Sequence, residues 1–327
     1  MLLLFGSTRL HAQQSVPMQY TYQIADTLRL RSKLEFLADS SCMGRATGTK
    51  AMSKVTIWLN QRFKDMGLAP IGNNYIHHFY TETGPIGRNV IGMIPSGKAY
   101  CTSYTIVMAH YDGIGKINDI IYPGADSNAS GVVGMLTLAE MFTTMRKFSQ
   151  HYDGNIIFVA TDGKDLNMTG AENLYYLLHD LYLRDPFNGE MITLDRISLV
   201  VNLDQIGSTM SPLSSAKPEY LIMLGNESLK KEYQNVIKLY NFEHGFHLDL
   251  GFDYYGSKNF TDTFYRRVGE QKFFVEDHIP AVMFTSGITM NNNKPYDNVG
   301  SLDLEVLKKR ILLIFHWLET LVPAPQR

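Results

Sequence analysis

The sequence predicts an α/β protein, a three-layer α/β/α sandwich with a mixed, mostly parallel sheet. Short continuous apolar segments, typical of strands buried on both faces, alternate with longer amphipathic segments of helical period. The 327 residues are 45% hydrophobic and 19% charged, which supplies material for a sizeable core. No repeat, low-complexity tract or linker-like segment divides the chain. We therefore expect a single domain over residues 24–323.

The elements follow in order along the chain. Apolar residues at helical spacing predict a helix over residues 27–37 and a longer one over 51–66, which Gly67 ends as a C-cap. From residue 89 onward, apolar strands and helices alternate. The predicted strands cover residues 89–94, 103–109, 155–160, 197–203, 220–224 and 281–285, and the predicted helices cover 129–144, 169–181, 227–240 and 302–321.

The N-terminus predicts the cellular compartment. A short apolar run before the small residue Ala12 is typical of the end of a secretory signal, so residues 1–14 are interpreted as a signal-peptide remnant. We expect a periplasmic or secreted protein. No later stretch approaches the roughly 20 apolar residues that span a bilayer, and no membrane span is expected. The formal net charge of −2 comes without a basic stripe, so no nucleic-acid partner is expected. Cys42 and Cys101 allow one disulfide, and the sequence leaves their pairing open.

Acidic and histidine residues follow several predicted strands. His110 comes directly after one strand, Asp165 and Asp204 follow two others, and Asp126 stands in a loop before a helix. The carboxyl ends of parallel strands meet at one sheet edge, so these side chains should lie close together. Crowded carboxylates need a neutralising cation, and one imidazole with several carboxylates suits Zn²⁺, Mn²⁺ or Co²⁺. Asp112 is placed to accept the second ring N–H of the histidine and fix its tautomer.

At these positions the chain resembles the co-catalytic zinc aminopeptidases, a family that includes bacterial leucine aminopeptidases and whose relatives include glutaminyl cyclases and the non-catalytic transferrin receptor. The resemblance covers roughly residues 30–322. Its most specific segment is Gly-Ala-Asp-Ser-Asn-Ala-Ser-Gly at 124–131. The remaining segments are Ala-His-Tyr-Asp at 109–112, Ala-Thr-Asp-Gly-Lys-Asp at 160–165, Asn-Leu-Asp-Gln-Ile-Gly at 202–207, and shorter matches at 44–49, 89–92 and 279–281.

The resemblance implies two metal positions. His110 and Asp204 would bind the first metal, and Asp126 would bridge both. Asp165 stands where the family has a glutamate ligand of the second metal.

Two positions depart from the family pattern. The catalytic glutamate base is replaced by Lys164, and the last histidine ligand is replaced by Asn293. A lysine is a poor base at neutral pH, and an amide is a weak zinc ligand. The resemblance therefore implies one zinc ion per chain, at the first position. With three carboxylates and one lysine, a single divalent ion balances the charge. We hypothesise that the Lys164 ammonium lies near the second metal position and pairs with Asp165 or Asp126.

Three functions remain open from the sequence. The first is an aminopeptidase homologue, impaired or inactive in catalysis, that binds a peptide, a protein N-terminus or another partner in the old cleft. The second is an active single-metal aminopeptidase that uses Asp165 or Lys164 for proton transfer. The third, glutaminyl cyclase chemistry, depends on the glutamate that Lys164 replaces and is the least favoured.

Overall fold

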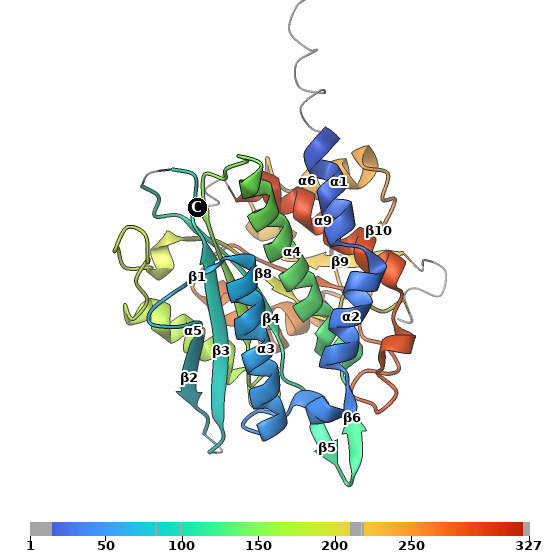
Figure 1. Ribbon diagram of the computed structural model, residues 1–327. Coiled ribbons are helices and arrows are strands. Elements are labelled where there is room, and N and C mark those ends of the chain that lie inside the picture. The colour runs from blue at the N-terminus through green and yellow to red at the C-terminus, as the bar shows by residue number, and fades with distance from the viewer. Residues whose placement is uncertain (1–14, 83, 99, 210–216, 218, 323–327) are drawn as a thin grey trace, which may run out of the picture.

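The computed structural model describes residues 15–82, 84–98, 100–209, 217 and 219–322, and it is built around a nine-stranded mixed sheet with helices on both faces (Figure 1). This confirms the predicted fold class. The central strands run in the order β7, β4, β8 and β11 and are mutually parallel. Antiparallel pairs flank them, β3 on β7 at one side and β9 on β11 at the other. The predicted signal remnant, residues 1–14, lies outside the described residues.

The bounds of the six predicted strands agree closely with the structure, which adds five short strands that were not predicted, β1, β2, β5, β6 and β10. The strands of the large sheet are β1 (Ala69–Pro70), β2 (Ile76–Tyr80), β3 (Ile86–Ile94), β4 (Tyr104–His110), β7 (Asn155–Thr161), β8 (Ile197–Leu203), β9 (Tyr220–Leu224), β10 (Asp249–Gly251) and β11 (Ala281–Thr285). A separate hairpin is formed by β5 (Gly115–Ile117) and β6 (Ile120–Tyr122), and it projects from the body of the molecule (Figure 1).

The helices form two layers. One apolar core joins the first face of the sheet to α2 (Thr27–Leu37), α3 (Lys50–Met66), α4 (Ser130–Lys147), α6 (Val236–Glu243) and α9 (Leu304–Leu321). A second core joins the other face to α5 (Thr169–His179) and α8 (Lys272–Glu276). Three helices were not predicted, namely α1 (Ser15–Ile24), α7 (Lys258–Thr263) and α8. No helix among the described residues is long and apolar enough to cross a membrane.

One predicted helix is wrong in its bounds. The pattern over residues 227–240 predicts a continuous helix, but the structure has a short turn at Asn226–Ser228 and starts α6 at Val236. The Ser228 hydroxyl donates to the carbonyl of Ala281 at 3.0 Å and so ties the turn to β11. This tertiary contact replaces the first helical turns that the periodicity indicates.

The two cysteines are both free. Cys42 is buried and donates its thiol to the Phe36 carbonyl, and Cys101 is partly exposed. The pairing that the sequence left open is therefore not formed in this structure.

Candidate functional site

The turn after β6 is held by a buried amide. The Asn128 side chain donates to the Leu203 carbonyl at 2.8 Å and accepts the backbone N–H groups of Gly131 at 3.1 Å and Gln205 at 2.9 Å. A side chain at Gly131 would meet Asn128 Oδ1 at 2.4 Å, so glycine is required there. The Asn128 amide thus joins the start of α4 to the end of β8.

Two more side chains fix the same turn. Asp297, from the loop after β11, accepts the backbone N–H groups of Asp126 at 2.7 Å and Ser127 at 3.0 Å. The guanidinium of Arg45 is fully buried and donates to main-chain carbonyls alone; its acceptors are those of Leu37, Tyr111, Pro123 and Gly124. The backbone of the turn is therefore satisfied without any metal ion.

One oxygen of the Asp126 carboxylate is bonded to groups at the start of α4 and after β8. Its Oδ1 accepts the hydroxyl of Ser130 at 3.0 Å and the backbone N–H groups of Gly207 at 2.8 Å and Ser208 at 3.2 Å. Burial, reinforced by the nearby Asp297 carboxylate, raises the pKa of Asp126 to about 7. The neighbouring Ser127, and not Asp126, lines the cavity that contains His110. Ser127 therefore occupies the place on the cavity wall where the resemblance led us to expect Asp126.

His110 lies between two carboxylates. Its Nδ1 is 3.5 Å from Asp112 Oδ1 and its Nε2 is 3.6 Å from Asp204 Oδ1, and the imidazole is 5% exposed. Burial opposes protonation, but the hydrogen bonds and charges of Asp112 and Asp204 outweigh it and raise the pKa of His110 to about 10. Asp112 also accepts the backbone N–H of Asp165 at 3.2 Å. The His110 Nδ1 atom also lies 3.3 Å from the backbone carbonyl of Asp112, and Asp112 Oδ1 has no hydrogen-bond partner among the described residues. The Asp112 carboxylate thus lies beside the ring, but the predicted hydrogen bond from the ring to this carboxylate stays a prediction.

Lys164 points into the site. Its ammonium donates to Asp204 Oδ2 at 3.1 Å and to the Val268 carbonyl at 2.8 Å, and the side chain is 17% exposed. Burial alone would raise the pKa of Asp204, but the Lys164 ammonium and the His110 ring hold that pKa well below its usual range. The expected pairing of Lys164 with Asp165 or Asp126 is therefore wrong. The turn after β7 places the ammonium over the end of β8 instead.

Glu270 is a site residue that sequence reasoning missed. It is fully buried, and neither carboxylate oxygen has a hydrogen-bond partner among the described residues. Burial raises the pKa of Glu270, and the charges of His110 and Lys164 oppose that shift. The signal in the sequence is faint, because Glu270 is a lone carboxylate just before α8 and follows no strand.

The remaining predicted positions meet at a small cavity of about 10 Å³, room for roughly one water molecule. Asp165, which is exposed, and Asn293 both line it beside His110 and Ser127. These donors do not fit the zinc that the resemblance implies. Within the described part of the chain, no group of three or more His, Cys, Asp or Glu side chains is arranged to hold a metal ion. Asp204, moreover, already accepts the Lys164 ammonium.

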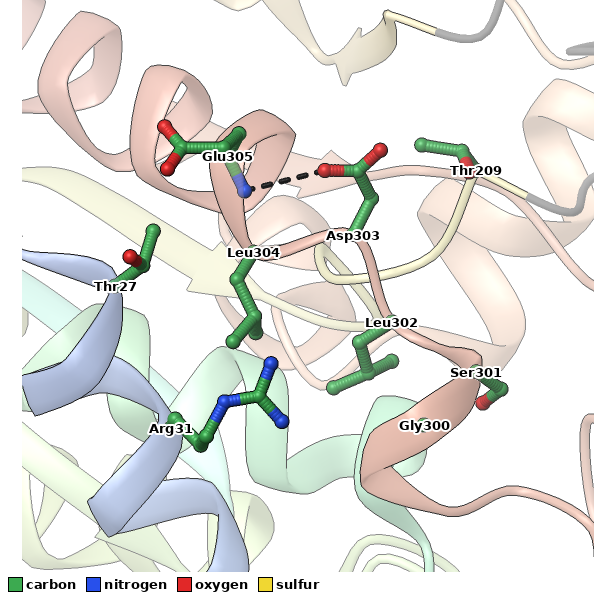
Figure 2. Close-up of a pocket in the computed structure, with 9 residues that line it drawn as sticks. All are labelled: Thr27, Arg31, Thr209, Gly300, Ser301, Leu302, Asp303, Leu304 and Glu305. Carbon is green, nitrogen blue, oxygen red and sulfur yellow. Dashed lines mark hydrogen bonds between the residues drawn. The ribbon is translucent and has the colours of Figure 1, made fainter.

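A larger open pocket, of about 480 Å³, lies at the start of α9 (Figure 2). It is lined by Thr27, Arg31, Thr209 and residues 300–305. The Asp303 carboxylate caps α9 by accepting the backbone N–H groups of Glu305 and Val306 at 3.1 Å, so this carboxylate is already used within the fold. None of the predicted site residues lines this pocket.

Comparisons with known proteins agree with this architecture. BSAP, a zinc aminopeptidase from Bacillus subtilis, superimposes with a TM-score of 0.68 over 92% of this chain and 96% of its own, at 13% identity. LapB from Legionella pneumophila gives 0.69 over 98% of this chain and 79% of its own, at 14% identity. Porphyromonas gingivalis glutaminyl cyclase gives 0.64 over 90% and 98%, at 15% identity. At these identities the likeness concerns the fold.

Curated relatives match parts of the sequence. The alkaline phosphatase isozyme conversion protein of Escherichia coli K12 is 29% identical over 177 residues, 50% of this chain and 47% of its own length. The BOS complex subunit ncln of Danio rerio is 27% identical over 128 residues, 36% of this chain and 21% of its own. The chain thus spans about half or less of the length of these relatives. The model of peptidase family M28 matches residues 89–317, well over half of the chain. The chain therefore belongs to peptidase family M28.

Proposed function

We propose that this chain is an M28-family protein impaired in peptide hydrolysis, which binds a peptide or protein partner at the mouth of the old cleft. The observation that carries this proposal is the Lys164 ammonium, which is bonded to Asp204 where the resemblance expects a carboxylate base. A protonated amine cannot take a proton from an attacking water. Loss of a general base alone typically costs about 10²- to 10⁴-fold in rate.

The alternative is an active single-metal aminopeptidase, and the expected single zinc ion per chain belongs to it. That reading needs His110 and Asp204 to share a metal and Asp165 to act as the base. The 3.6 Å separation of His110 Nε2 and Asp204 Oδ1 is compatible with two ligands of one ion, each about 2 Å from it. The Lys164 ammonium on Asp204 counts against this alternative.

Exposed apolar side chains on the two segments that contribute to the cavity wall, the loop after β11 and the β5–β6 hairpin, support a macromolecular partner; we call these side chains the rim. In the loop after β11, Met290 is 81% exposed and Tyr296 is 72% exposed, on either side of Asn293. On the hairpin, Ile117 and Ile120 are about half exposed. Large exposed apolar side chains around a polar centre are typical of protein interaction sites. The names of the ncln relatives describe subunits of a complex, which favours a protein partner here too. We place this protein in the periplasm or outside the cell.

A hydrolysis assay on amino-acid p-nitroanilides, with added zinc, tests the catalytic part. The wild type should give no turnover above the buffer blank. The triple variant Lys164→Glu, Asn293→His, Ser127→Asp should gain measurable turnover, because it returns a base and two donors to the cavity wall. A wild-type activity that the single change Lys164→Glu abolishes would favour the alternative.

A peptide array tests the binding part. Binding should survive a chelator and should fall at least about tenfold in Tyr296→Ser, which removes a rim aromatic. The matched control is Tyr80→Ser, since Tyr80 is 85% exposed on β2, a segment that contributes no residue to the cavity wall. Equal loss in both variants would mean that the rim is not the binding surface.

A further inference from the structure

The Lys164 ammonium lies among charged groups and is largely shielded from solvent. Two of its three N–H donors are used, by the Asp204 carboxylate at 3.1 Å and by the Val268 carbonyl at 2.8 Å. The side chains of the pair are 17% and 9% exposed. Removing one partner of such a buried pair leaves an uncompensated charge, which is strongly destabilising.

More negative than positive charge surrounds this ammonium. Asp112, Asp204 and Glu270 are all buried. His110 and Lys164 are the cations in contact with or facing them. Glu270 has no hydrogen-bond donor within the described residues, so its charge is offset only through space. Lys164 and His110 both face Asp204 and Glu270, and Lys164 donates a hydrogen bond to Asp204.

A divalent ion and this ammonium would compete for the same carboxylate. Zinc binds carboxylate oxygens at about 2.0–2.2 Å and would have to displace Lys164 from Asp204. The displaced ammonium would then lie close to the zinc ion, which adds like-charge repulsion. The wild-type arrangement therefore opposes metal binding at Asp204, because the ion would have to displace a bonded ammonium.

We infer that the Lys164 ammonium is the resident cation of this site, so that the native fold neither needs nor takes up zinc. The same geometry implies that loss of the ammonium leaves His110, Asp204 and Glu270 as a cavity that attracts a divalent cation. This inference goes beyond the proposed function, because it concerns metal independence and holds whether or not the cleft binds a partner.

Thermal unfolding and zinc content test the inference without any activity measurement. Wild-type protein should retain well under one zinc per chain after zinc equilibration and dialysis, and neither zinc nor a chelator should shift its Tm. Lys164→Met should lower the Tm by roughly 5 °C or more in metal-free buffer, and zinc should restore part of that loss. Lys164→Arg keeps the charge and should stay closer to the wild type.

Lys98→Met is the matched control. Lys98 pairs with Asp153 at 3.0 Å, but the two side chains are 53% and 54% exposed. Its loss should shift the Tm by only about 1 °C and create no zinc response. One zinc per wild-type chain would overturn the inference, and so would a Lys164→Met variant with unchanged Tm. If Lys164→Met does not fold, the wild-type zinc titration decides alone, because a zinc-dependent Tm would overturn the inference and its absence would support it.

Discussion

The turn at residues 124–131 and the cluster around Lys164 form two halves of the site, and different forces hold them. In the turn, the Asn128 amide and the Asp297 carboxylate satisfy main-chain groups. In the cluster, charged side chains face one another, and Glu270 has no hydrogen-bond partner among the described residues. One half of the site is therefore held by hydrogen bonds to the main chain, and the other half is held by attraction between charged side chains.

The largest expected effect comes from breaking the turn. Asn128→Ala removes one side chain that bonds several buried main-chain groups, and each group left unsatisfied is costly. We expect a loss of about 3 kcal/mol in the free energy of unfolding, measured by denaturant titration. Asn298→Ala, which removes a single exposed cap bond to Gly300, should cost about 1 kcal/mol or less. Similar costs for both variants would show that the turn does not depend on the buried amide.

A smaller effect should follow from neutralising Asp297. Asp297→Asn keeps one acceptor for the backbone N–H groups of Asp126 and Ser127 but loses the second carboxylate oxygen and the charge. We expect a cost of about 1–2 kcal/mol by the same titration. If Asp297→Asn were as costly as Asn128→Ala, the turn would depend on charge as much as the Lys164 cluster does.

The smallest effect is on the pH dependence of stability, and it comes from His244, which does not line the cavity. His244 stacks on His316 at 4.0 Å, and His316 contacts Glu319. Burial and the His316 ring lower the pKa of His244 from 6.5 to about 4. Between these values the unfolded chain binds a proton that the folded chain does not, so stability should fall as the pH drops through this range.

His244→Phe keeps an aromatic ring in the stack and removes this proton. Unfolding titrations across the same pH range should show a flatter decline for the variant than for the wild type. An unchanged slope would mean that His244 does not contribute. The pH profile of stability of the His244→Phe variant can then serve as the baseline when the pH dependence of variants in the Lys164 cluster is measured.

The predicted strands match the sheet well because each one is a continuous apolar run that can be identified from the local sequence alone. The apolar runs at 197–203, 220–224 and 281–285 match the observed strands in both bounds. The helix at 227–240 failed because the contact of Ser228 with β11 depends on the assembled sheet. Periodicity does not report such a contact.

The candidate site was predicted less completely. His110 and Asp204 lie close together as predicted, because the end of a strand determines both where a side chain lies and which way it points. Asp126 and Ser127 are neighbours in one irregular turn, and only the folded backbone decides which of them lines the cavity. The partner of Lys164 was likewise set by the path of the turn after β7, which the spacing of residues does not encode.

Arg45 has a consequence for how a partner would bind. One guanidinium links the helical layer at Leu37, the end of β4 at Tyr111, and the segment before the turn at Pro123 and Gly124. These segments cannot shift independently without leaving buried donors unpaired. The segments that Arg45 links are therefore held rigidly before any partner binds, and binding would require little rearrangement of them. Less conformational entropy is lost when such a surface binds, so a small interface can be sufficient for a stable complex.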